Sequence, residues 1–125
     1  MKVNRRHFIR TSVGTSLALS SAPMIHARPA DKFKTALIGT GWWGMNILRT
    51  AVAAGESKVV AMCDVDENQL QPAAQEIEQL SGDQPKKYKD YRELLSREKP
   101  DIAIVATPDH WHPLCMIAAV QAGAH

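Results

Sequence analysis

The sequence of 125 residues predicts an α/β protein with a doubly wound parallel sheet, a Rossmann-like fold that is incomplete at its C-terminal edge. Four short apolar segments alternate with segments of helical periodicity. A glycine-rich turn follows the first apolar segment, and an acidic residue ends the second. The rules for such sheets give the strand order 3-2-1-4, which places the loops after the first and fourth strands beside one crevice, where a ligand is expected.

The first predicted strand, residues 34–38, leads into a Gly-x-Gly-x-x-Gly turn. Gly39 and Gly41 have no Cβ, so the main chain can turn tightly and come close to a diphosphate. Gly44 lets the helix predicted over residues 42–54 pack closely on the first strand. The start of that helix offers free N–H groups and a positive dipole end. The whole turn is a cofactor-binding candidate: Gly39, Thr40, Gly41, Trp42, Trp43 and Gly44. The alternative is a glycine-rich turn that binds nothing.

Two tryptophans, Trp42 and Trp43, fill the variable positions of the turn. Each indole can either form a wall of the cofactor site or pack against the sheet, and we expect one of each. Gly55 follows the helix, and we expect it to end the helix in the left-handed conformation.

The second predicted strand, residues 58–63, ends at Asp64, about 20 residues after Gly44. At this position a carboxylate can accept hydrogen bonds from both hydroxyls of a ribose. Asp64 is therefore the next cofactor-binding candidate. It favours NAD over NADP, because a carboxylate repels a 2′-phosphate and no Lys or Arg directly follows Asp64 to bind one.

Two further helices carry capping signals at their starts. Asp66 with Gln69, and Asp90 with Glu93, have the spacing of capping boxes. Within the first of these helices, Pro72 predicts a kink or a restart, because proline has no N–H to donate.

The remaining predicted elements complete the sheet and one of its faces. A short third strand covers residues 86–88. The fourth strand, residues 101–106, is nearly all apolar, as expected for a parallel strand covered on both faces. A last helix begins at His110 or His112 and ends at about Ala122.

The loop after the fourth strand supplies five more cofactor-binding candidates: Thr107, Pro108, Asp109, His110 and His112. The loop faces the crevice with groups that donate, accept or stack, so we expect it to contact the ribose or ring of the nicotinamide. His110 and His112 also suggest a metal site. Histidines two residues apart point away from each other on a helix and no third ligand is nearby, so no metal is predicted. The alternative for this loop is a plain helix start in which Pro113 occupies the first turn and His112 packs.

The chain has 15 Lys and Arg against 13 Asp and Glu, a net charge of +2. The basic excess lies before residue 31, and the rest of the chain carries ten basic and thirteen acidic residues. No nucleic acid partner is therefore expected. Cys63 and Cys115 lie in apolar segments and are expected to be buried thiols rather than a disulfide framework.

Residues 1–30 are predicted to be a twin-arginine (Tat) signal peptide and a polar joint, ahead of a nucleotide-binding domain of residues 31–125. Arg5 and Arg6 are followed by an aromatic, an aliphatic and a basic residue. The modestly apolar stretch that comes next is too short and too polar for a membrane anchor. The predicted location is the periplasm or another exported compartment. The alternative is a basic amphipathic tail that is never cleaved.

Residues 33–125 resemble the amino-terminal half of the Gfo/Idh/MocA family of oxidoreductases. The segments that carry the resemblance are 36–44, 63–66, 90–95, 106–112 and 122–125. Asp109 stands where the family more often has Asn, while His112 matches the family pattern.

The resemblance implies NAD or NADP, a sugar or cyclitol substrate, hydride transfer and a homo-oligomer of the full-length protein. Family members continue into a fifth strand with an acid–base lysine and into a separate substrate domain. We therefore expect these residues to be a fragment that exposes its fourth strand as an unpaired edge, binds NAD weakly and does not catalyse alone. No catalytic residue is assigned. The other hypotheses are a fragment of a glycoside hydrolase that uses NAD as a built-in redox cofactor, and a non-catalytic nucleotide-binding module.

Overall fold

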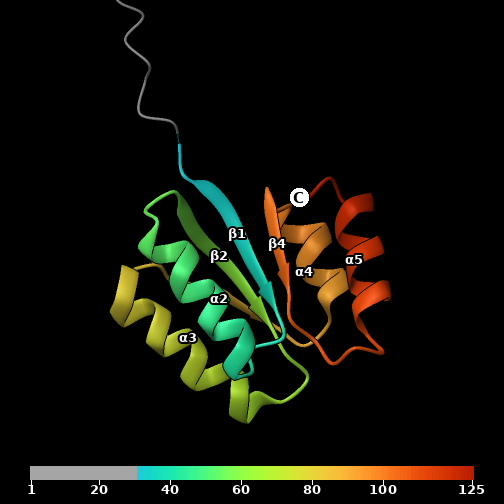
Figure 1. Ribbon diagram of the computed structural model, residues 1–125, viewed down its shortest axis with the longest axis horizontal. Coiled ribbons are helices and arrows are strands. Elements are labelled where there is room, and N and C mark those ends of the chain that lie inside the picture. The colour runs from blue at the N-terminus through green and yellow to red at the C-terminus, as the bar shows by residue number, and fades with distance from the viewer. Residues whose placement is uncertain (1–30) are drawn as a thin grey trace, which may run out of the picture. The chain divides into compact units, whose positions relative to one another are not determined.

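The computed structural model describes residues 31–125 and shows a sheet between two layers of helices (Figure 1). The predicted export signal of residues 1–30 lies outside the described residues. In chain order the elements are β1 (Phe33–Ile38), α2 (Trp42–Ala53), β2 (Ser57–Cys63), α3 (Glu67–Ser81), β3 (Lys86–Tyr88), α4 (Tyr91–Glu98), β4 (Ile102–Val105) and α5 (His112–Gln121).

All strand pairs are parallel, and the strand order is β3-β2-β1-β4. This confirms the predicted doubly wound sheet and its order. Successive side chains of a strand point to opposite faces, and this alternation divides the core in two. Leu37 and Met62 pack with α2 and α3, whereas Ala36 and Cys63 pack with α4 and α5. With both faces covered, the carboxyl ends of the strands meet at one edge of the sheet.

Helix α3 runs without interruption through Pro72, so the predicted restart does not occur. The proline removes one main-chain donor from the helix, and its ring is exposed. Leu70 and Ala73, on either side of it, are only 2% and 5% exposed. Their burial against the sheet holds the helix together across the missing hydrogen bond.

Asp66 and Asp90 cap α3 and α4, as predicted. Their carboxylates accept hydrogen bonds from the main-chain N–H groups of Asn68 and Arg92, both at 2.9 Å. The reciprocal side-chain bonds of a capping box are not formed at these two helix starts. The main-chain N–H of Asp66 donates instead to Asp64 Oδ1 at 3.0 Å, which ties the start of α3 to the end of β2.

Strand β4 is an edge of the described sheet, as expected, and pairs only with β1, but His125 supplies two hydrogen bonds to its other side. His125 donates its main-chain N–H to the carbonyl of Asp101 at 2.9 Å and accepts a hydrogen bond from the N–H of Ala103 at 2.8 Å. This is the bonding pattern of parallel strands. The residues of β4, Ile102–Val105, are accordingly half-buried along the whole strand.

Two close approaches fix the glycine turn against the sheet. A Cβ at Gly44 would lie 2.2 Å from the carbonyl oxygen of Gly39 and 3.2 Å from Leu37 Cδ1. Gly39 has a φ of 96°, and a Cβ there would lie 2.6 Å from the carbonyl of Ala106, just after β4. Neither position can hold a side chain without moving main chain, which explains two of the three glycines of the turn.

Replacing Gly44 by Ala should destabilise the fold by about 1–3 kcal/mol or more, because the new methyl group meets main chain that cannot move aside. Gly41→Ala is the matched control: a Cβ at Gly41 would meet no atom within 4 Å. The cost of that change should stay below about 1 kcal/mol. Urea unfolding followed by circular dichroism measures both variants. Equal stability of the two would contradict the close packing of α2 on β1.

Candidate functional site

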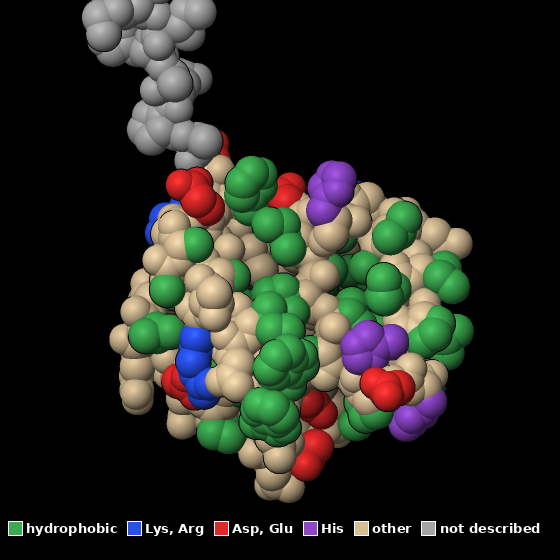
Figure 2. All heavy atoms as spheres, in the orientation of Figure 1, with side chains coloured by type: hydrophobic (Ala, Val, Ile, Leu, Met, Phe, Trp, Pro, Cys, Tyr) green, Lys and Arg blue, Asp and Glu red, His purple; other side chains and the backbone are tan. Residues whose placement is uncertain are grey.

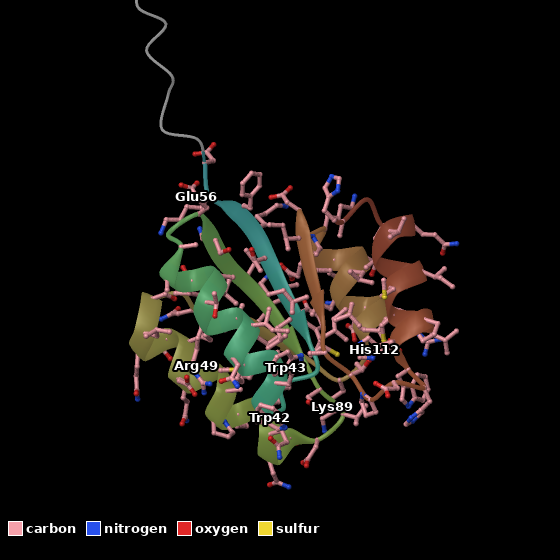
Figure 3. All side chains as sticks on the ribbon, in the orientation of Figure 1. Trp42, Trp43, Arg49, Glu56, Lys89 and His112 are labelled. Atoms are coloured by element: carbon pink, nitrogen blue, oxygen red, sulfur yellow. The ribbon has the colours of Figure 1, made fainter. Side chains whose placement is uncertain are left out.

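A cavity of about 660 Å³ opens at the carboxyl ends of the strands. Its walls come from the loops that follow β1, β2, β3 and β4, so segments far apart in the sequence meet at this edge. Figure 3 shows Trp42, Trp43, Lys89 and His112 at the same end of the molecule. The cavity lies where the strand order predicts a ligand crevice.

The structure brings most of the predicted candidates to this cavity. Those that line it are Gly39, Gly41, Trp42, Trp43, Asp64, Thr107, Pro108 and His110. Thr40 and Gly44 are held inside the turn. Asp109, in the loop after β4, and His112, the first residue of α5, do not form part of the cavity wall.

Helix α2 begins at the cavity without a side-chain cap. Gly41 is its N-cap residue, with φ −66° and ψ 177°, and the first turn contains no acidic residue. The N–H groups of the first turn have no partner within the helix and carry the positive end of its dipole, so this end suits an anion. Because a Cβ at Gly41 would meet no protein atom, packing does not explain why this residue is a glycine.

Both tryptophans project into solvent from the start of α2 (Figure 3). Trp42 is 75% and Trp43 57% exposed, so the expectation that one of them packs against the sheet is wrong. Helix α2 packs through Gly44, Met45 and Leu48 instead. The two indoles contact each other edge to face, with ring centroids 5.4 Å apart. Figure 2 shows large hydrophobic side chains exposed at this end of the molecule, where the two indoles form one wall of the cavity.

Asp64 is held by three protein donors. Its Oδ2 accepts from the main-chain N–H of Thr40 at 2.8 Å and from the Thr40 hydroxyl at 2.9 Å. Its Oδ1 accepts from the N–H of Asp66 at 3.0 Å. A carboxylate offers about four acceptor positions, so roughly one remains, on Oδ1. Contact between this carboxylate and the hydroxyls of a ribose stays a prediction.

The sequence did not suggest the wall that the loop between β3 and α4 contributes. The main-chain N–H of Asp64 donates to the carbonyl of Tyr88 at 3.1 Å, which brings this loop beside the carboxylate. The strand order could have revealed it, because β3 lies next to β2 and its carboxyl end meets the same edge. The lining residues of this wall are Lys89 and Asp90 of the loop and Tyr91 and Arg92 of the first turn of α4.

Both cations of this wall are already paired. Lys89 Nζ lies 3.2 Å from Glu67 Oε2, and its hydrogen bond lowers the pKa of that carboxyl. Arg92 Nε lies 3.1 Å from Asp90 Oδ1 and likewise lowers the pKa of Asp90. Among the residues that line this side of the cavity, the carboxylates of Asp64 and Asp90 stand against the cations of Lys89 and Arg92, so the charges balance.

The loop after β4 directs some of its polar groups onto itself. His112 begins α5, with a proline in the first turn. Its Nδ1 lies 3.3 Å from the carbonyl oxygen of Pro108 and 3.5 Å from the Thr107 hydroxyl. This is the helix-start alternative, and contact between this loop and a nicotinamide stays a prediction. His110 and Trp111 line the cavity, and Trp111 was not among the predicted candidates.

Cys63 and Cys115 are buried free thiols, 3% and 1% exposed, as predicted. Burial, and then the nearby carboxylates of Asp64 and Asp90, raise the pKa of Cys63 to about 12. Burial also raises the pKa of Cys115. Both thiols remain protonated at neutral pH, so neither is a nucleophile although both border the cavity.

The groups around the cavity fit a dinucleotide. The bare start of α2 suits a diphosphate, the open space at Gly41 admits it, and Asp64 keeps an acceptor for a ribose hydroxyl.

Within residues 31–125, no group of three or more His, Cys, Asp or Glu could hold a metal ion. In the same stretch, no helix combines the length and apolar character needed to cross a membrane.

A glycine turn at a bare helix start, with a carboxylate at the end of the next parallel strand, defines a dinucleotide-binding α/β protein. The sequence profile described as "Oxidoreductase family, NAD-binding Rossmann fold" (GFO_IDH_MocA) matches residues 33–125. The chain therefore belongs to the Gfo/Idh/MocA family of NAD-binding oxidoreductases, which confirms the resemblance seen in the sequence.

Three proteins illustrate what the chain is similar to. A glycosyl hydrolase family 109 protein of Shewanella pealeana is 28% identical, over 100% of this chain and 33% of that protein. The WlbA dehydrogenase of Bordetella pertussis, in complex with NADH and UDP-GlcNAcA, is 28% identical, with a TM-score of 0.61 over 75% of this chain and 28% of that one. The myo-inositol 2-dehydrogenase of Lactobacillus plantarum is 26% identical, with a TM-score of 0.62 over 75% and 26%. The chain thus spans a third or less of the length of these proteins.

Proposed function

We propose that the chain binds NAD and forms the nucleotide-binding part of an exported oxidoreductase that transfers hydride between the nicotinamide and a sugar or cyclitol. The observation that carries the binding proposal is Gly41. No protein atom requires a glycine there, yet the residue lies at the bare start of α2 and lines the cavity. A diphosphate that must approach the main chain closely explains the missing side chain.

The chain's own residues bind and orient the cofactor in this proposal. NAD, when bound, supplies the ring carbon that accepts or donates the hydride. The N–H groups at the start of α2 bind the diphosphate, and Asp64 Oδ1 accepts from a ribose hydroxyl. Trp42 and Trp43 exclude water from one side of the cavity, and the loop after β4 faces the nicotinamide end.

The carboxylate of Asp64 supports NAD rather than NADP. A 2′-phosphate would lie near the carboxylates of Asp64 and Asp90, which line the cavity. Lys89 and Arg92 line the same side, but Lys89 already pairs with Glu67 and Arg92 with Asp90. The carboxylate of Asp64 would therefore repel the phosphate, whereas a free hydroxyl would find an acceptor on Asp64 Oδ1.

The NAD proposal is tested by isothermal titration of the chain with NAD. The Gly41→Ala variant should fold as stably as the parent chain but bind NAD at least about tenfold more weakly, because its methyl group occupies the space of the diphosphate. Urea unfolding of the same variant serves as the control that its fold is intact. Equal affinity of the parent and Gly41→Ala chains would remove the main support for the proposal.

A second candidate is glycoside hydrolysis in which NAD acts as a built-in redox cofactor. It is favoured by the family 109 glycosyl hydrolase, which aligns with the whole of this chain. The dehydrogenase candidate is favoured by the WlbA dehydrogenase, whose structure holds NADH with a sugar nucleotide. Both candidates share the proposed NAD site.

The two candidates differ in what happens to NAD during turnover. For a dehydrogenase we expect the protein expressed from its gene to reduce added NAD while it oxidises a sugar or cyclitol. The increase in NADH absorbance measures this reaction. For the hydrolase we expect release of the phenol from an aryl glycoside with no net change in NADH. A protein that binds NAD and does neither would be a nucleotide-binding module without catalytic activity.

We also propose export through the twin-arginine pathway, supported by the Arg5-Arg6 pair and the residues that follow it. Replacing both arginines by lysine should keep the protein in the cytoplasm, because the pathway reads the pair itself rather than its charge. Cell fractionation and immunoblotting of a bacterium with an intact pathway measure the location. Arg28→Lys, outside the motif, should leave export unchanged. Export of the double-lysine variant at the parent level would contradict the proposal.

A further inference from the structure

Thr40 lies between two glycines of the turn, yet it does not face the cavity. It is only 2% exposed, and it is absent from the cavity wall that Gly39 and Gly41 help to form. Its main-chain N–H and its hydroxyl both donate to a single oxygen, Asp64 Oδ2. Thr40 therefore reaches the ligand site only through the carboxylate of Asp64.

The two bonds from Thr40 determine which acceptor positions of Asp64 remain for a ligand. Oδ2 already accepts twice, and Oδ1 accepts once, from Asp66. The unfilled acceptor position therefore belongs to Oδ1. Hydrogen bonds to a charged group are stronger than those between neutral groups, so the pair from Thr40 holds the carboxylate in one orientation.

The glycine turn does not need the Thr40 hydroxyl to stay in place. The main-chain N–H of Gly39 donates to the carbonyl of Cys63 at 2.8 Å, and Gly39 and Gly44 pack tightly against main chain. Removing the hydroxyl leaves all of these contacts, and it also leaves the bond from the Thr40 N–H to Asp64. The hydroxyl therefore acts on the orientation of Asp64 rather than on the path of the chain.

We infer that Thr40 is a positioning residue that sets the preference for NAD over NADP by orienting the Asp64 carboxylate. The inference rests on the proposed NAD site. Without the hydroxyl, Oδ2 loses one of its two donors and the carboxylate can turn away from the ribose. The favourable bond to the ribose hydroxyl and the repulsion of a 2′-phosphate then both weaken.

The test is isothermal titration of NAD and NADP into the 125-residue chain and its Thr40 variants. Thr40→Val, which replaces the hydroxyl by a methyl group, should weaken NAD binding about tenfold and narrow the ratio of the two affinities by a similar factor. Thr40→Ser keeps the hydroxyl and should stay within about twofold of the parent for both cofactors. Should Thr40→Val fail to fold in urea unfolding, Thr40→Ala removes the same hydroxyl with less crowding.

A double-mutant cycle with Asp64→Ala shows whether Thr40 acts through Asp64. In the Asp64→Ala chain, adding Thr40→Val should change neither affinity further. An unchanged NAD-to-NADP ratio in Thr40→Val, or the same tenfold loss when Asp64 is already absent, would overturn the inference while leaving NAD binding intact. A parent chain that binds neither dinucleotide would overturn the proposed function, and this inference with it.

Discussion

The close approach of the glycine turn to the ends of β1 and β4 is the constraint on which the rest of the structure depends. Gly39 lies against the carbonyl of Ala106, and Gly44 lies against the carbonyl oxygen of Gly39. These contacts bring the start of α2 to the carboxyl edge of the sheet and leave its N–H groups at the cavity. A helix placed further from the strands would have no such cavity at its end. The fold and the candidate site therefore share one packing requirement.

Much of the fold follows from short-range signals. Apolar strands, the glycine turn and the caps at Asp66 and Asp90 gave the elements and, with the rules of connection, the strand order. The restart predicted at Pro72 does not occur, because the burial of neighbouring side chains outweighs one lost hydrogen bond. Burial is a property of the tertiary structure, which the local sequence does not show. The partial pairing of β4 by His125 was missed for the same reason: it joins residues that are distant in sequence.

The candidate site was harder to predict, because a motif names residues without saying where each side chain points. The turn, Asp64 and part of the loop after β4 do meet at the cavity. The pattern assigned the same role to Gly41 and Thr40, yet one opens into the cavity and the other is buried against Asp64. The wall that holds Lys89 and Arg92 was predicted only as the start of a helix, and the order of the strands brings it beside Asp64.

The burial and protonation of the Cys63 thiol have a consequence for the proposed export from the cytoplasm. Disulfide exchange requires a thiolate, and a buried thiol with a pKa near 12 supplies almost none at the pH of an oxidising compartment. The two buried thiols, Cys63 and Cys115, border the cavity, and burial disfavours their exchange with disulfides and small thiols. Folding itself acts as the protecting group, so a chain exported already folded arrives with that protection in place.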